Sequence, residues 1–154
     1  RLSFDNFPIP KQQQIEADGV EVLFYCLRLG RCMLAAMSAG YQRMLAADAL
    51  HFARQRDGVG GRVVRHELPR LNLGKVLGGA LQARALSHLS LEQDAAGADL
   101  AGLRDLTKSA AAGTALESLH ATEHVLGGRT FHLGQRSSEA RANLHVFGVV
   151  EGED

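Results

Sequence analysis

The stretch Leu34-Ala-Ala-Met-Ser-Ala-Gly-Tyr-Gln-Arg-Met-Leu-Ala-Ala-Asp-Ala-Leu-His-Phe52 decides the fold of this 154-residue chain. Its apolar residues recur every three or four positions, at Leu34, Met37, Tyr41, Met44, Leu45, Ala49 and Phe52, while Gln42, Arg43 and Asp48 fall on the other face. This spacing is typical of an amphipathic helix with one face toward a core. The pattern starts near Ile15 and ends near Arg56, where Gly58-Val-Gly-Gly61 stops it.

Three further helices are expected after this first one, which we place at about 16–56. Pro69 suits the first turn of a second helix over about 67–94, and Asp99 suits the N-cap of a third over about 98–126. Gly127-Gly128 closes the third helix, and a short fourth helix is expected over about 137–147. Long helices with short connections predict an all-α fold, an antiparallel four-helix bundle of three long helices and one short helix.

The N-terminal segment differs from the rest of the chain. Leu2-Ser-Phe-Asp-Asn-Phe7 alternates apolar and polar residues like a strand, and Pro8-Ile-Pro10 stops the alternation. We interpret residues 1–14 as the end of a preceding β-domain with its linker, and residues 15–154 as the helical bundle domain. The segment is not a signal peptide and lacks an initiator Met, so we expect a piece of a longer chain.

Composition excludes several classes of protein. Lys+Arg and Asp+Glu both number 17, and this balance argues against a nucleic-acid binder. No apolar run approaches the length of a membrane span, so none is expected. Cys26 and Cys32 lie six residues apart in an apolar helical stretch, which indicates reduced, buried thiols in a cytoplasmic protein.

Two local patterns suggest chemistry but fail their context tests. His120-Ala-Thr-Glu-His124 matches an inverted zinc-protease motif, yet only 30 residues follow it to supply a further ligand, and we expect no metal. Gly58-Val-Gly-Gly-Arg62 follows a helix and lacks the G-K-[ST] ending of a phosphate loop, so it is interpreted as a helix–helix connection. The small residues Ala110–Gly113 would let another helix approach closely and favour self-association.

Five segments, taken in order, resemble the acyl-CoA dehydrogenase family. Phe4–Pro10 is similar to the end of its middle β-domain, and Gly30–Gly40 to its G-R-x-x-x-A-A-x-x-x-G helix. Phe52-Ala-Arg-Gln-Arg56 with Val59-Gly60 resembles Y-A-x-x-R-x-x-F-G. Lys108 with Val125-Leu-Gly-Gly128 resembles K…x-x-G-G, and Phe147–Gly152 resembles the closing segment that carries an E-G pair. The pattern runs from Arg31 to Glu151 without an insertion.

The resemblance implies a flavoenzyme fragment, the C-terminal helical domain. Such an enzyme binds FAD and an acyl-CoA thioester, and a carboxylate removes a proton from Cα while hydride leaves Cβ for the flavin. The domain supplies the base and part of the FAD pocket of a neighbouring subunit. It also implies a homodimer or homotetramer formed through these helices, and a possible electron-transfer partner.

The family's functional positions carry over residue by residue. Glu151, alone an acidic-tail residue, corresponds to the catalytic base, and Gly152 leaves room for a ligand beside it. Some members place the base just before the Arg of G-R, where Gly30 stands; Gly30 and Val150 would be small walls near the acyl group.

The cofactor positions follow in the same way. Arg56 corresponds to an arginine that meets the FAD diphosphate of the adjacent subunit, and a guanidinium suits that role because its planar fork donates two hydrogen bonds. Without the family, Arg56 is a solvated arginine at a helix end. Gly127 and Gly128 would let the backbone approach the dinucleotide, or would cap the third helix. His124 stands where the family has a glutamine.

Other departures leave alternatives open. Thr130 replaces a glycine, Glu153 replaces a threonine, and Ala142-Asn143 replace an Arg-Asp pair, with Arg141 adjacent. The E-G-E sequence also resembles acyl-CoA oxidases. The alternatives are therefore an acyl-CoA oxidase or flavin monooxygenase of the same fold, or a helical assembly module without flavin.

Overall fold

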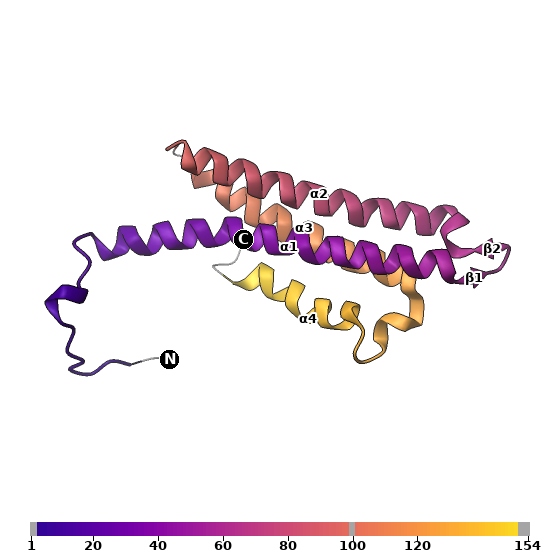
Figure 1. Cartoon of the computed structure of the whole chain (residues 1–154), viewed down its shortest axis with the longest axis horizontal. Helices are drawn as coiled ribbons and strands as arrows, with labels where there is room; N and C mark the ends of the chain where they lie inside the picture. Colours follow the sequence, from indigo (N-terminus) through magenta and orange to yellow (C-terminus); the bar gives the residue numbers. More distant parts are fainter. Residues whose placement is uncertain (1–2, 99–100, 151–154) are drawn as a thin grey trace.

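The longest element is helix α1, which runs from Gly19 to Gln55 in the computed structural model (Figure 1). The structure describes residues 3–98 and 101–150. The Asp18 side chain accepts a hydrogen bond of 2.8 Å from the Val20 N–H and so caps the helix. This bond satisfies one of the donors that a helix N-terminus leaves free. The helix expected over about 16–56 is confirmed, with its start at the residue after this cap.

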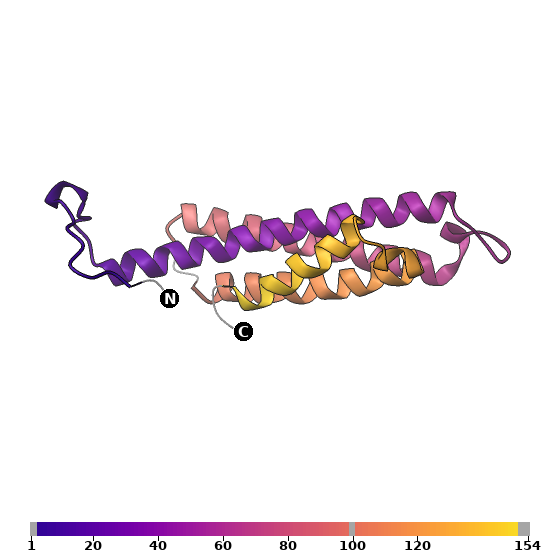
Figure 2. The same cartoon turned by 90° about the horizontal axis from the view of Figure 1, so that it is seen from below.

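Three further helices complete the bundle: α2 over Glu67–Ala95, α3 over Ala101–Leu126 and α4 over Arg136–Val149. Each of the three long helices packs on the other two, and the short α4 lies on α3 and α1 (Figures 1 and 2). A 3-10 segment, η3 (Gly127–Phe131), connects α3 to α4. The predicted all-α bundle of three long helices and one short helix is confirmed. The N-cap expected at Asp99 lies outside the described residues.

A small hairpin joins α1 to α2. Its strands β1 (Asp57–Gly58) and β2 (Gly61–Arg62) pair antiparallel, with Asp57 opposite Arg62. Gly60 and Gly61 have φ values of 86° and 125°, a region that glycine adopts without steric cost. A 3-10 turn, η2 (Val63–Arg65), then leads into α2. The glycine-rich stretch is therefore the helix–helix connection that the sequence predicts.

The segment before α1 carries no strand over residues 3–18, only the 3-10 turn η1 (Lys11–Gln13). The strand expected over 2–7 is thus not formed at 3–7. A strand is held by hydrogen bonds to a neighbouring strand, and over residues 3–98 and 101–150 β1 and β2 pair only with each other. Phe4 and Phe7 are exposed and meet edge to face at 6.1 Å between ring centroids. The assignment of residues 1–14 to a preceding domain stays a prediction.

The main core lies where α4 covers the long helices. Leu45, Val76, Leu119 and Leu144 come from the four helices and are buried together, and Phe147 packs with them. Tyr41 of α1 meets the Phe147 ring edge to face at 5.9 Å between centroids. These contacts place α4 along the C-terminal half of α1.

Alanines let the three long helices approach one another closely. Ala35, Ala39, Ala83 and Ala111 form a cluster of buried side chains drawn from α1, α2 and α3. Ala111 and Ala112 of the stripe Ala110–Gly113 are buried inside this chain, whereas Ala110 is half-buried and Gly113 is exposed. The two buried alanines therefore serve helix packing within one chain. Self-association itself stays a prediction.

The first turns of α1 extend beyond the other helices (Figure 1), and their apolar side chains are exposed. Val20, Leu23, Phe24 and Tyr25 are each more than half exposed. Cys32 is buried, but Cys26 is exposed, which corrects the expectation that both thiols are buried. The helical pattern showed which residues are apolar, but not how far the neighbouring helices reach along α1.

Helix α1 is long and apolar enough to cross a membrane by length and composition alone. Its mean hydropathy reaches 1.4 over an 18-residue window, of which 22% is buried. The expectation that no stretch approaches such a length is wrong for α1 on this measure. Uninterrupted apolar runs in α1 are short, but its many alanines and its cysteines raise the mean. The core helix of a bundle passes the same test, and α1 packs against α2, α3 and α4.

A polar seam lies inside the bundle, formed by Ser38, Gln42, Thr114 and Ser118. The Gln42 amide donates to Ser38 Oγ at 3.0 Å, and Ser118 Oγ donates to Gln42 Oε1 at 2.7 Å. Ser38 Oγ in turn donates to the Ala111 carbonyl at 2.9 Å. Gln42 is 0% exposed, so its sequence-based placement on the face away from the core is wrong. The amide is buried because α3 covers that side of α1 and its hydroxyls satisfy it.

Gly79 of α2 packs directly on this seam. A Cβ at position 79 would lie 2.3 Å from Gln42 Oε1 and 2.8 Å from Ser118 Oγ, both closer than any normal contact. The neighbouring Gly78 is exposed, and a Cβ there would meet nothing within 4 Å. Packing therefore requires a glycine at position 79, whereas position 78 has space for a side chain.

We expect Gly79→Ala to destabilise the bundle by about 1–3 kcal/mol, because Gln42 and Ser118 must separate and leave buried polar atoms without partners. Gly78→Ala should stabilise it by roughly 0.5–1 kcal/mol, since alanine loses less backbone freedom on folding. Denaturant unfolding followed by circular dichroism measures both free energies. Equal effects of the two substitutions would contradict the packing described for Gly79.

Candidate functional site

The four positions proposed for a cofactor meet at one end of the bundle. Arg56 is the C-cap of α1, His124 lies in the last turn of α3, and Gly127 and Gly128 open η3. All four line one pocket of about 550 Å³, which we call the glycine-turn pocket. Its other lining residues are Phe52, Val63, Val125, Leu126, Arg129 and His132.

The chain turns at two places beside this pocket, at the end of α1 and at the end of α3. At Arg56 the backbone becomes extended, with φ −79° and ψ 125°, and its N–H closes the helix on the Phe52 carbonyl. At Gly127 the chain turns out of α3 with φ 59°. A Cβ added at Gly127 or Gly128 would meet nothing within 4 Å, so the backbone of this turn is open to a ligand.

The ionisable groups of the glycine-turn pocket are all basic residues. Arg56 and Arg129 line it together with the imidazoles of His124 and His132. Within residues 3–98 and 101–150, no carboxylate forms an ion pair with either arginine. Unpaired guanidinium groups beside an open glycine backbone suit a phosphate or diphosphate. Phe52 and Val63 add an apolar surface for an attached planar group.

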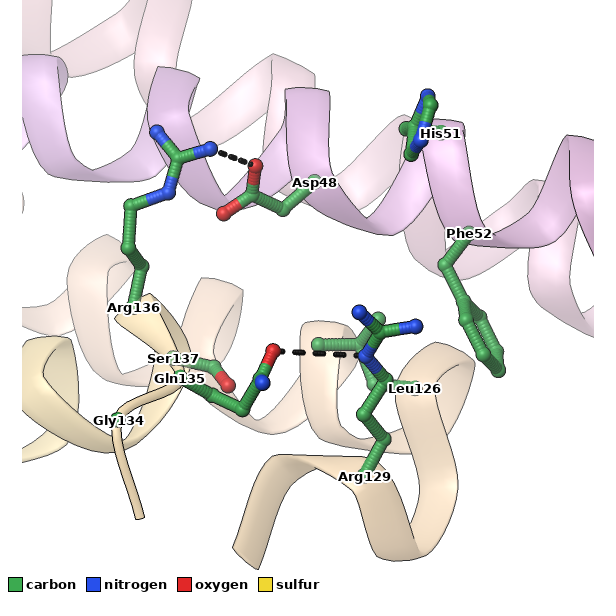
Figure 3. A pocket seen from close by; sticks show the side chains of 9 residues that line it. All are labelled: Asp48, His51, Phe52, Leu126, Arg129, Gly134, Gln135, Arg136 and Ser137. Carbon is green, nitrogen blue, oxygen red and sulfur yellow. Dashed lines mark hydrogen bonds and ion pairs between the residues drawn. The ribbon is translucent and has the colours of Figure 1, made fainter. Parts of the chain in front are cut away.

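A second, smaller pocket adjoins the first (Figure 3). It has a volume of about 230 Å³ and shares Phe52, Leu126 and Arg129 with the glycine-turn pocket. Asp48 of α1 and Arg136 of α4 close one side of it with an ion pair of 2.7 Å. We call it the Asp48 pocket.

Sequence reasoning did not identify Arg129 or His132 as pocket residues. Both lie after the double glycine, in η3 and at its C-cap, so the turn that exposes Gly127 also carries them to the same end of the bundle. The signal in the sequence was a basic residue directly after Gly127-Gly128. Helical periodicity does not extend across such a turn.

The residues proposed for the substrate lie elsewhere. Gly30 is half-buried within α1, and Val150, 38% exposed, is the C-cap of α4. Helix α4 runs antiparallel to α1, from Arg136 beside Asp48 to Phe147 beside Tyr41. Its C-terminal end therefore points toward the half of α1 that contains Gly30. The proposed base, Glu151, and its neighbour Gly152 lie outside the described residues.

The structure shows the contacts of three residues at or beside the positions that depart from the family pattern: Thr130, Arg141 and Asn143. Thr130 is buried, and its hydroxyl finds no hydrogen-bond partner among the described residues. Arg141 pairs with Glu123 of α3 and lies over the Phe131 ring at 5.1 Å from its centroid. Asn143 donates to the Tyr41 hydroxyl at 2.9 Å. Arg141 and Asn143 thus hold α4 onto η3, α3 and α1.

The His120–His124 motif has a structural explanation. Both histidines are exposed on α3, while Glu123 between them is engaged by Arg141. In the part of the chain that the structure describes, no three His, Cys, Asp or Glu side chains are grouped to hold a metal ion.

Comparison with known proteins gives one family. The sequence profile described as "Acyl-CoA dehydrogenase, C-terminal domain" matches residues 17–154. No curated protein sequence matches the chain.

Solved structures give the same fold. The acyl-CoA dehydrogenase of Slackia heliotrinireducens superposes with a TM-score of 0.85 at 21% identity, over 98% of this chain and 40% of that one. The butyryl-CoA dehydrogenase of Megasphaera elsdenii gives 0.83 at 18% identity, over 88% and 35%. A chain from the structural study of the electron transferring flavoprotein of Acidaminococcus fermentans gives 0.82 at 17% identity, over 97% and 40%. This chain therefore spans well under half the length of these structures.

Proposed function

This chain belongs to the acyl-CoA dehydrogenase family through its C-terminal helical domain, and from that premise we propose that the complete protein performs FAD-dependent α,β-dehydrogenation of an acyl-CoA thioester. The observation that carries the proposal is the glycine-turn pocket, in which Arg56, His124, Gly127 and Gly128 come together. The family match covers residues 17–154, which include Glu151. The isolated domain holds only part of each site.

The glycine-turn pocket fits the dinucleotide part of FAD. Arg56 would donate to the diphosphate, and the open backbone at Gly127 and Gly128 lets that group approach closely. His124, exposed in the last turn of α3, would contact the cofactor as a further lining residue of the same pocket. FAD, when bound, supplies the acceptor for the hydride that leaves Cβ of the acyl group.

Glu151 would act at the acyl group. An α-proton beside a thioester is weakly acidic, so its removal needs a base held close to Cα and shielded from water. Hydrogen bonds to the thioester carbonyl would stabilise the charge that develops as the proton leaves. Helix α4 ends at Val149, and its C-cap is Val150. Glu151 directly follows this cap in the sequence. Val150 and Gly30 would leave space for the acyl chain.

Arg56 and Glu151 would serve different flavins. Tyr41, which contacts Phe147 of α4, lies 15 residues before Arg56, or about 22 Å along α1 at the usual rise per residue. Helix α4 continues from Phe147 away from Arg56, so Val150 lies farther still from the glycine-turn pocket. Only the short ribityl chain separates the diphosphate of FAD from its flavin ring. This separation supports the proposal that Arg56 and Glu151 of one chain serve two different FAD molecules, because Glu151 directly follows Val150 in the sequence.

The proposal consequently requires an oligomer. Each chain would give its base to one flavin and its glycine-turn pocket to the flavin of a neighbour, in a homodimer or homotetramer. The exposed apolar side chains in the first turns of α1 are available for contacts with other domains or subunits. Reoxidation of the flavin would then need an electron-transfer partner. We place the protein in the cytoplasm, where its two cysteines would remain reduced.

A spectrum of the complete protein tests this function. We expect a bound flavin whose visible band bleaches on anaerobic mixing with at least one acyl-CoA in a series of chain lengths. A protein that binds no flavin would be a helical assembly module, and the proposal would fail. Flavin that no acyl-CoA bleaches would also refute it. Rapid reoxidation of the reduced flavin by air would identify an oxidase or monooxygenase of the same fold instead.

A further inference from the structure

Arg129 lies at the boundary between the two pockets. It is exposed in η3, directly after Gly127-Gly128, and lines both the glycine-turn pocket and the Asp48 pocket. Figure 3 shows its side chain between Gln135 and Phe52. No family position identified by the sequence assigns it a role.

The guanidinium of Arg129 makes two contacts. Its carbon atom Cζ lies 5.6 Å from the centroid of the Phe52 ring, within the range of a cation–π interaction. Its Nε donates to Gln135 Oε1 at 3.4 Å (Figure 3). The two terminal nitrogens make no hydrogen bond within the described residues. These contacts leave the planar fork of Arg129 available for a ligand.

The charge of Arg129 is also uncompensated, unlike that of Arg136 and Arg62. Arg136 in the Asp48 pocket is paired with Asp48 at 2.7 Å, and Arg62 on the hairpin is paired with Asp57 at 3.3 Å. Arg56 and Arg129 are the two arginines of the glycine-turn pocket, and neither has a carboxylate partner in the described part of the chain. The pocket thus offers two guanidinium groups, one from the end of α1 and one from η3.

We propose that Arg129 is a second cofactor-binding residue, which contacts the FAD diphosphate together with Arg56. The inference rests on the proposed function. A diphosphate carries a negative charge on each phosphate, and one guanidinium can donate two hydrogen bonds to one phosphate. Two arginines therefore match the ligand better than Arg56 alone. Phe52 and Gln135 are positioning residues, because they act on the cofactor only through Arg129.

The test is Arg129→Gln in the complete protein, with Arg136→Gln as the matched control. Both substitutions remove one exposed arginine from the same end of the bundle, but Arg136 is neutralised by Asp48 and does not line the glycine-turn pocket. Titration of the flavin-free protein with FAD, followed by flavin fluorescence, gives the dissociation constant. We expect Arg129→Gln to raise it at least about tenfold, the loss of one charge-assisted contact. Arg136→Gln should change it less than about twofold, since a paired exposed charge contributes little.

Three further measurements identify the cause. Adenosine diphosphate, which carries the diphosphate without the flavin, should compete with FAD less well for Arg129→Gln than for the parent. Arg129→Lys keeps the charge but not the planar fork, so its FAD affinity should lie between those of the parent and of Arg129→Gln. The unfolding temperature of the flavin-free protein should be unchanged by Arg129→Gln, because the side chain is exposed.

The outcomes separate this inference from the proposed function. If Arg56→Ala weakens FAD binding and Arg129→Gln does not, Arg129 is not a cofactor residue and the proposed function stands. If Arg129→Gln weakens FAD binding only as much as Arg136→Gln does, the inference is overturned. An equal loss for Arg129→Lys and Arg129→Gln, with unchanged competition by adenosine diphosphate, also overturns it. If the parent binds no FAD, the proposed function fails first.

Discussion

Glu151→Gln in the complete protein should leave FAD bound and slow flavin reduction by acyl-CoA by about 10²–10⁴-fold or more, the usual contribution of a positioned general base. Glutamine has nearly the size of glutamate and still forms hydrogen bonds, but its amide cannot accept the α-proton. The proton must leave as hydride departs from Cβ, so no later step compensates for the lost base. The loss should therefore lie at the upper end of this range or beyond it.

Rapid anaerobic mixing, with the flavin band as the signal, measures this rate. Asp154→Asn is the matched control, because it removes another carboxylate of the same C-terminal segment three residues later. We expect the control to reduce its flavin at the parental rate. Bleaching of Glu151→Gln as fast as the parent would show that Glu151 is not the base.

Arg56→Ala should act on the cofactor and not on the chemistry. Removal of a charge-assisted contact to phosphate is expected to weaken FAD binding by about 10–100-fold. Once saturated with FAD, the variant should reduce its flavin at nearly the parental rate, since Arg56 lies far from the end of α4. Arg54→Ala is the control, because Arg54 is exposed in the last turn of α1 but does not line the glycine-turn pocket. Equal FAD affinities for the two variants would contradict the role of Arg56.

The helices could be predicted well from the sequence, because their signals are local. Three-to-four spacing and the glycine stop at Gly58 placed α1, and Pro69 placed the start of α2 within two residues. Gln42 shows where local reasoning stops. Its polarity suggested a solvent-facing position, but α3 covers that side of α1 and supplies hydroxyls to the amide. Such burial depends on a helix about 70 residues away in the chain, which periodicity in α1 cannot show.

In the candidate site, too, the residues of local motifs could be predicted, and contacts between distant segments could not. Arg56, His124 and the double glycine came from motif resemblance, and the structure brings them together in one pocket. Arg129 was missed because its direction is set by the turn at Gly127 and by contacts with Phe52 and Gln135. Those contacts join residues from α1 and from two connections. Neither a helical pattern nor a family motif predicts them.

The central claim is that each chain serves two flavins, with its base at one and its glycine-turn pocket at the other. Mixed oligomers of Glu151→Gln and Arg56→Ala test it most directly. In a mixed dimer under this account, one site carries both substitutions and the other carries neither. The measurement is flavin bleaching by acyl-CoA at an FAD concentration that leaves Arg56→Ala alone largely empty. We predict that mixing restores fast bleaching at up to half of the sites in each mixed dimer, although neither variant bleaches fast alone. No restoration, despite demonstrated exchange of subunits, would show that Arg56 and Glu151 act on the same flavin and would contradict the account.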